Sequence, residues 1–216
     1  LTTIGDNAFY RCSALTSMSS LSNVTKIGES AFSYCSSLTS VGDMSNVTSL
    51  GSRAFGGCIA LKSIGDLPKV MSIGEWTFAG CAALKSVGNM PNVTSLAHGA
   101  FAGYTLYDDD GQKIRTDYCT SLQSIGNMPK LTTIGDSAFS RCSSLTSVGD
   151  LGNVTNIGSY AFGDCIVLKS IGNLPKVTSI GEYAFAGCAA LKSVGNMPNL
   201  TSIGERAFAD YSLYDD

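Results

Sequence analysis

The sequence predicts a right-handed α/β solenoid, in which each coil of 23 residues carries two short parallel strands and one turn of 3₁₀- or α-helix. The first observation is a column of aliphatic residues spaced by 23, beginning Ile4, Ile27, Leu50. The second is a column of phenylalanines that runs from Phe9 to Phe208. The third is that all 8 cysteines share one repeat position. Because one such unit cannot bury its own apolar face, copies must stack into a shared core.

Each unit contains two runs that predict short parallel strands. In one copy they are Leu84-Lys-Ser-Val87 and Val93-Thr-Ser-Leu96. Runs rich in β-branched residues and bounded by Gly, Pro or Asn are typical of short strands. The Ala-Phe segment that completes the coil is too short for a stable α-helix and supports one helical turn at most.

The composition excludes several classes of protein. The chain has 216 residues, a net charge of −3 and only 14% charged residues. No stretch approaches the ~20 apolar residues needed to cross a bilayer, and there is no basic patch for nucleic acid. Leu, Ile, Val and Phe recur throughout, which argues against disorder. A soluble protein with a buried core remains.

The cysteine column predicts a buried ladder of free thiols. Stacked parallel neighbours point the same way, and a buried free cysteine behaves as a small hydrophobe. Paired disulfides are the alternative, because adjacent coils lie within disulfide range. With no CxxC and only one histidine, His98, we expect no metal site and no cofactor. The ladder comprises Cys12, Cys35, Cys58, Cys81, Cys119, Cys142, Cys165 and Cys188.

No residue is predicted to be catalytic. One histidine against equivalent cysteines gives no privileged nucleophile–base pair. The acidic residues at one repeat position, such as Asp6 and Glu29, are more simply a solvated face or cap. A column of Asp and Asn after the first strand fits turn hydrogen bonding better than cation binding. This column comprises Asp43, Asp66, Asn89, Asn127, Asp150, Asn173 and Asn196.

Comparison of the copies identifies a candidate binding edge. The second position after the glycine of the second strand varies most between units. Trp, Tyr and Arg dominate interface hot spots, although ordinary surface variation is the alternative explanation. The candidate residues are Arg53, Trp76, Tyr160, Tyr183 and Arg206.

An insert at about residues 105–118 interrupts the period. Its Asp-Gly pair predicts a turn between two strands of a hairpin, and insertions in solenoids often project and bind. Its acidic run lacks the spacing and distal Glu of an EF-hand, so a calcium site is only an alternative. The candidate insert residues are Tyr107, Asp108, Asp109, Asp110, Lys113 and Arg115.

The repeat resembles the leucine-rich repeats of the BspA-like family. The matching segments are Cys188-Ala-Ala-Leu191-Lys-Ser-Val194 and Val177-Thr-Ser-Ile180-Gly-Glu-Tyr-Ala184-Phe185. The resemblance covers all of the chain except roughly Thr105 to Tyr118. The family usually continues its first strand as Ile-x-Ile-Pro, whereas this chain has Val-Gly-Asn-Met-Pro, so we expect a bend at the Gly that follows the first strand. The resemblance implies a leucine-rich-repeat solenoid from a bacterial or protist protein, exposed on the cell surface or secreted. It also implies adhesion to host matrix proteins or to other microbes.

We therefore expect residues 1–216 to form a single solenoid, a fragment of a longer protein, with a protruding insert. The expected function is a non-catalytic, extracellular adhesion module that binds a protein or glycan partner. We expect a monomer that neither binds nucleic acid nor inserts into a membrane. The alternative is a structural spacer that presents another domain.

Overall fold

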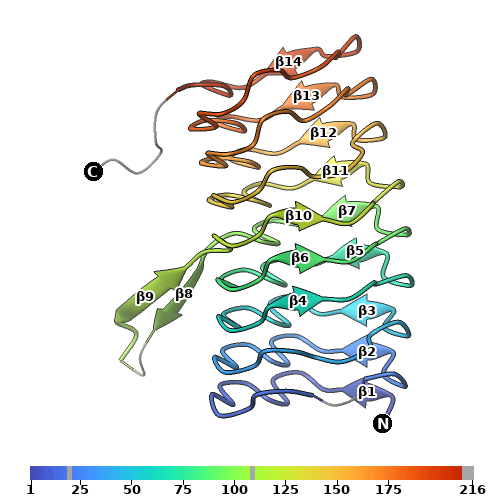
Figure 1. Cartoon of the computed structure of the whole chain (residues 1–216), viewed down its shortest axis with the longest axis vertical. Coiled ribbons are helices and arrows are strands. Elements are labelled where there is room, and N and C mark those ends of the chain that lie inside the picture. The colour runs from blue at the N-terminus through green and yellow to red at the C-terminus, as the bar shows by residue number, and fades with distance from the viewer. Residues whose placement is uncertain (19–20, 108–109, 211–216) are drawn as a thin grey trace.

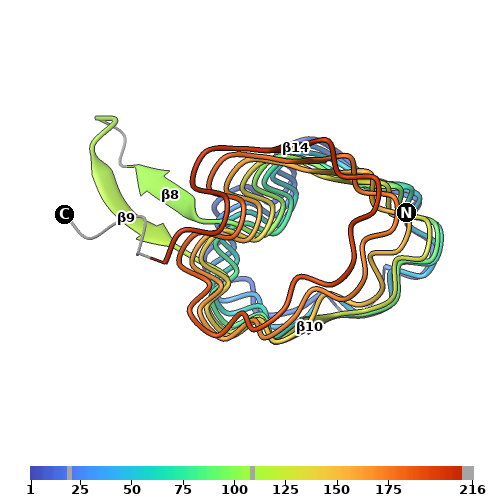
Figure 2. The same ribbon diagram turned by 90° about the horizontal axis from the view of Figure 1, so that it is seen from above.

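The computed structural model describes residues 1–18, 21–107 and 110–210. Nine coils stack on one another along one axis and form a regular column (Figures 1 and 2). We number the coils 1 to 9 by their phenylalanines, from Phe9 to Phe208.

One series of short strands runs through all nine coils and carries the aliphatic column. Within each strand the first residue points outward and the second points into the core, except at β14, where both residues are exposed. Neighbours pair in parallel and in register, as in Ile4 opposite Ile27. The strands form two ladders, β1-β2-β3 and β5-β7-β11-β12-β13-β14. Their bounds are β1 Thr3–Ile4, β2 Lys26–Ile27, β3 Ser49–Leu50, β5 Ser72–Ile73, β7 Ser95–Leu96, β11 Thr133–Ile134, β12 Asn156–Ile157, β13 Ser179–Ile180 and β14 Ser202–Ile203.

The other series lies on the opposite face of the coil and is less regular (Figure 2). It contains β4 (Ser63–Ile64), β6 (Ser86–Val87) and β10 (Ser124–Ile125), which form one parallel sheet. The other described coils contribute only isolated bridges, such as Ser170 to Ser193. The expected bend at the following glycine explains the difference. It has a positive φ in the coils with only a bridge, at Gly42, Gly149, Gly172 and Gly195, but not after β4, β6 or β10.

The expected helical turn in each coil is wrong, since none of the described residues forms a helix, and the fold is a β-solenoid rather than α/β. In coil 2, the N–H groups of Ser30, Phe32 and Tyr34 donate to carbonyls of coil 3 at 2.8–2.9 Å. The intervening Ala31, Ser33 and Cys35 donate three residues back along their own coil. In addition, Ser30 and Tyr34 have φ of 51° and 60°. Alternating partners and left-handed residues produce a series of tight turns, which excludes helix.

The core is a set of continuous columns through the stack. The phenylalanine rings stack almost parallel, with centroids 5.0–5.6 Å apart. Seven of these rings are at most 1% exposed, and only those of the end coils, Phe9 and Phe208, are more accessible.

The insert forms an antiparallel hairpin of β8 (Tyr104–Tyr107) and β9 (Lys113–Asp117). It projects from one end of the coil outline and leans along the N-terminal coils (Figures 1 and 2). The Asp-Gly turn predicted from the sequence includes Gly111, which has a φ of 76°.

Candidate functional site

The candidate edge lies at a strained backbone position. Every coil has a left-handed residue there, with φ between 49° at Trp76 and 60° at Gly99. L-residues other than Gly, Asn and Asp rarely adopt this conformation. The coil nevertheless places large side chains there, because the turn requires the backbone geometry and the side chain projects outward.

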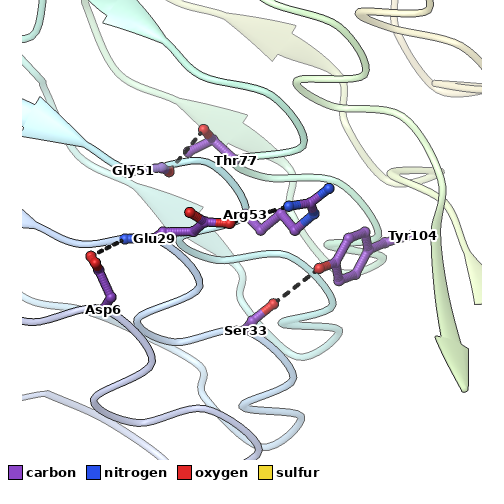
Figure 3. Close-up of polar contacts among 7 residues, drawn as sticks. All are labelled: Asp6, Glu29, Ser33, Gly51, Arg53, Thr77 and Tyr104. Carbon is purple, nitrogen blue, oxygen red and sulfur yellow. Dashed lines mark hydrogen bonds and ion pairs between the residues drawn. The ribbon is translucent and has the colours of Figure 1, made fainter.

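The structure divides the edge residues into two groups. Arg53 lies over the Trp76 ring at 4.7 Å and pairs with Glu29 at 3.3 Å (Figure 3). In coils 7 to 9, the Tyr160 and Tyr183 rings stack at 4.9 Å. Arg206 donates to the Tyr183 hydroxyl at 3.0 Å. Between the groups the column carries Gly99 and Ser137, so the five candidates do not form one continuous patch.

Gly56 and Gly80 of the solenoid form the contact site for Tyr104 of the hairpin, which we call the hairpin seat. A Cβ on Gly56 would lie 2.9 Å from the Tyr104 ring, and one on Gly80 would lie 2.7 Å from the Tyr104 Cβ. The Tyr104 hydroxyl lies 3.3 Å from Ser33 Oγ (Figure 3). Burial raises the pKa of Tyr104 above its ordinary value of 10.0. The ring is therefore a neutral anchor.

Two side chains of the N-terminal coils bind the outer edge of β8. The Tyr34 hydroxyl donates to the Thr105 carbonyl at 2.5 Å, and Arg11 Nη2 donates to the Tyr107 carbonyl at 2.8 Å. Burial is also the main reason that the pKa of Tyr34 is raised. These bonds satisfy carbonyls that an edge strand would otherwise expose, and they hold the hairpin against the solenoid.

A groove of about 490 Å³ separates the hairpin from coils 1 to 3. Two of the candidate insert residues, Tyr107 and Arg115, line it together with Leu106 and Ile114. Arg115 is paired with Asp117 at 2.7 Å. Of the other insert candidates, Asp110 and Lys113 are exposed, while Asp108 and Asp109 lie outside the described residues.

Sequence reasoning missed a second left-handed column, at the position before every cysteine except Cys119. Arg11, Tyr34, Arg141 and Asp164 occupy it with φ of 56–61°. Arg141 lies over the Tyr118 ring at 4.6 Å and 3.7 Å from Asp164. The available signal was the variation of this position among otherwise similar copies.

The cysteines are all free, and those from Cys35 to Cys188 are buried. Each buried thiol donates to a phenylalanine carbonyl of the preceding coil at 3.1–3.4 Å, as Cys35 does to Phe9. Burial raises the pKa of Cys35 from 9.0 to about 11 and that of Cys119 to about 12. Cys12 departs from the predicted buried ladder: it is exposed, because coil 1 has a neighbour on one side only.

The polar columns serve the stack itself. Asp6 accepts the backbone N–H of the equivalent residue in the next coil, Glu29, at 2.8 Å (Figure 3). Asp66 accepts that of Asn89 in the same way at 2.7 Å. Asp43 instead caps its own turn by accepting from the N–H of Ser45. Within the described ranges, no three His, Cys, Asp or Glu side chains are grouped so that they could hold a metal ion.

The repeat matches a known family. The model of the BspA type leucine rich repeat region matches residues 2–108 and 116–215, in 6 copies. This chain belongs to the BspA-type leucine-rich repeat family.

The chain is also similar to solved structures. A leucine-rich repeat protein of T. pallidum is 31% identical over 78% of this chain and 72% of its own, with a TM-score of 0.65. A leucine-rich cell surface protein of Faecalibacterium prausnitzii is 24% identical over 98% of this chain and 80% of its own, with a TM-score of 0.45. A comparison with curated proteins gave no match. In the part of the chain that the structure describes, no helix could span a membrane.

Proposed function

We propose that this BspA-type solenoid is a non-catalytic adhesion module of a cell-surface or secreted protein. It binds a protein or glycan partner through the face that carries the edge column and the hairpin. One observation carries the proposal: large aromatic and guanidinium side chains occupy left-handed positions where Gly or Asn is easier to accommodate. Strained positions of this kind are concentrated at functional sites.

The shape of this face supports the assignment. The hairpin is held to the solenoid by Tyr34 and Arg11, so the groove wall beneath it is already formed before a partner arrives. Preorganised surfaces bind more tightly because less conformational entropy is lost on association. Tyr107 and Ile114, at 49% and 57% exposure, place apolar surface beside that groove.

The test is a binding screen against immobilised matrix proteins and a glycan array, with the triple variant Trp76→Ala, Tyr160→Ala, Tyr183→Ala. We expect the variant to bind its partner at least ~10-fold more weakly, as for loss of hot-spot residues. The matched control replaces the four exposed lysines that follow the first-strand leucines with Ala: Lys62, Lys85, Lys169 and Lys192. It should bind as the native chain does.

A structural spacer is the second candidate, favoured by the identical bonds that join one coil to the next, such as Thr48 and Thr178 to the preceding threonine carbonyls. A spacer would show no partner at up to ~100 μM. Equal binding by the native chain and the triple variant would also contradict the proposed face.

A further inference from the structure

A small polar pocket lies at the base of the hairpin, against coils 4 to 6. Its volume is about 230 Å³. The rings of Trp76, His98 and Tyr118 form part of its wall, and Ser137 and Ser140 lie opposite on coil 6. It is distinct from the groove, because the two share no lining residue.

Several departures from the repeat meet at this pocket. Trp76 and His98 are the only tryptophan and the only histidine of the chain, and their rings contact edge to face at 4.9 Å. Gly99 is the only glycine of the edge column, and a Cβ there would lie 2.5 Å from Trp76 Nε1. The insert supplies Tyr118. Surface variation spread evenly over the copies would not bring these changes together.

The chemistry of the wall selects a neutral ligand that carries hydroxyl groups. None of the lining side chains is a carboxylate, an ammonium or a guanidinium. The polar groups are hydroxyls, an indole N–H and an imidazole, and Thr105 and Thr116 share a hydrogen bond of 2.9 Å at the rim. Such groups both donate and accept. The nearest guanidinium groups, those of Arg53 and Arg141, are paired with Glu29 and Asp164, so an anionic ligand would have to compete with these carboxylates.

The aromatic rings favour a ligand with a flat C–H face. Arg53 and Arg141 lie over Trp76 and Tyr118 at 4.7 and 4.6 Å, which holds both rings in place. Each guanidinium occupies one face of its ring, so only the opposite, electron-rich face can attract the weakly positive C–H groups of a ligand. A pyranose ring presents C–H groups on its face and hydroxyls around its edge, and it matches both parts of the wall.

We propose that the pocket binds one neutral sugar ring, a hexose or an N-acetylhexosamine of a larger glycan. The proposal rests on the proposed function in taking Trp76 as a binding residue, and it specifies the ligand class. A single ring makes few contacts, so millimolar affinity, ~1–10 mM, is expected for the free sugar.

The single tryptophan makes the test specific to this site. The intrinsic fluorescence of the full chain is titrated with galactose, fucose and N-acetylglucosamine, with sorbitol as an acyclic control. At least one sugar should give a saturable change that sorbitol does not. Ser137→Tyr should abolish it by filling the pocket, since Tyr160 and Tyr183 show that the turn accepts tyrosine. Asn7→Tyr, at the same repeat position in coil 1, should leave it unchanged.

His98→Ala, at an exposed position, provides a second variant and should weaken sugar binding at least ~5-fold. Absence of a saturable change with every sugar, or a change that survives Ser137→Tyr, overturns the pocket assignment. If the triple edge variant loses partner binding while no sugar competes, the adhesion proposal stands and the sugar site fails. If no partner binds at all, the adhesion proposal fails, and the fluorescence titration alone decides the sugar site.

Discussion

Among the residues that the structure describes, twelve other than glycine hold a left-handed conformation, with φ between 49° and 61°. Each costs about 1–2 kcal/mol relative to an ordinary conformation. The stack tolerates this cost because the N–H of each such residue in coil 2, at Ser30 and Tyr34, donates to the next coil. Five of these twelve residues, Arg53, Trp76, Tyr160, Tyr183 and Arg206, are also those proposed to bind a partner.

The phenylalanine stack predicts a position-dependent loss of stability. Phe78→Ala removes a fully buried ring with stacked neighbours on both sides, and should lower the free energy of unfolding by about 3–5 kcal/mol. Phe208→Ala, at 38% exposure, should cost less than half as much. Urea unfolding of the two variants checks this difference. Equal losses would show that the column is not a cooperative core.

The buried thiols predict a loss of stability in alkali. The pKa of Cys35 is raised from 9.0 to about 11, and those of Cys119 and Cys188 to about 12. Above pH 9 the unfolded chain loses thiol protons that the folded chain keeps, so each thiol lowers the unfolding free energy by up to ~1.4 kcal/mol per pH unit. The contribution is present below pH 9 and is lost as the pH rises toward 11–12.

Urea unfolding between pH 7 and 11 measures this slope, and Cys35→Ala should reduce it. At neutral pH, Cys12 alone should react rapidly with a thiol reagent in the folded protein, since it is the exposed cysteine. A flat profile, or rapid reaction of every thiol, would argue against a buried ladder.

At the scale of the element, the sequence predicted the second strand of every coil correctly, whereas in the described part of the chain the first strand forms only at β4, β6 and β10. The predicted helical turn in the Ala-Phe segment was wrong. The repeat spacing transfers directly to the aliphatic, phenylalanine and cysteine columns, because equivalent residues must stack. The residues of coil 2 do not by themselves predict the left-handed conformation of Ser30, with its φ of 51°. That conformation is imposed by hydrogen bonds to the next coil, and the intrinsic propensities of the residues take no account of such bonds.

The site was predicted less completely than the fold. The hairpin could be predicted from its Asp-Gly turn, but its seat could not. Gly56 and Gly80 accommodate Tyr104, which lies far from Gly56 in sequence, and only the stacking brings them together. For the same reason the sequence does not predict the pocket at Trp76 and His98, which forms only when coils 4 and 5 stack.

The close contact between Gly80 and Tyr104 leads us to predict that adding one methyl group at position 80 displaces the hairpin. In Gly80→Ala, the new Cβ would lie 2.7 Å from the Tyr104 Cβ and 3.2 Å from the Asp117 carbonyl. Gly172→Ala is the matched control, because its φ of 70° is similar and no atom lies within 4 Å of its Cβ. Both should lose about 1–2 kcal/mol from backbone strain.

Only Gly80→Ala should speed hydrogen exchange in β8 and β9 and proteolysis near Gly111. Equal protection of the hairpin in the two variants would place the anchor elsewhere.

At the scale of the whole molecule, each coil bonds to its neighbours, and only the hairpin reaches across several coils. Stability should therefore be nearly additive along the stack of coils. Deletion of residues 143–165, one period of 23, restores every column in register. The shortened chain should keep its circular dichroism spectrum and a cooperative unfolding transition at a modestly lower temperature.

Deletion of residues 143–153 is the control, since it removes about half a period and shifts the following phenylalanines and cysteines out of their columns. It should abolish cooperative unfolding of the C-terminal coils. Comparable behaviour of both deletions would contradict a stack built from equivalent columns.

The left-handed edge position has a practical consequence for protein engineering. Because Asn, Ser, Arg, Trp and Tyr already occupy it at similar φ, from 49° to 57°, exchanging one for another leaves the backbone cost nearly constant. The nine coils therefore form a ready-made combinatorial library, in which side chains at the edge can be randomised without redesigning the core. Selection from such a library for new ligands would keep the scaffold and change only its specificity.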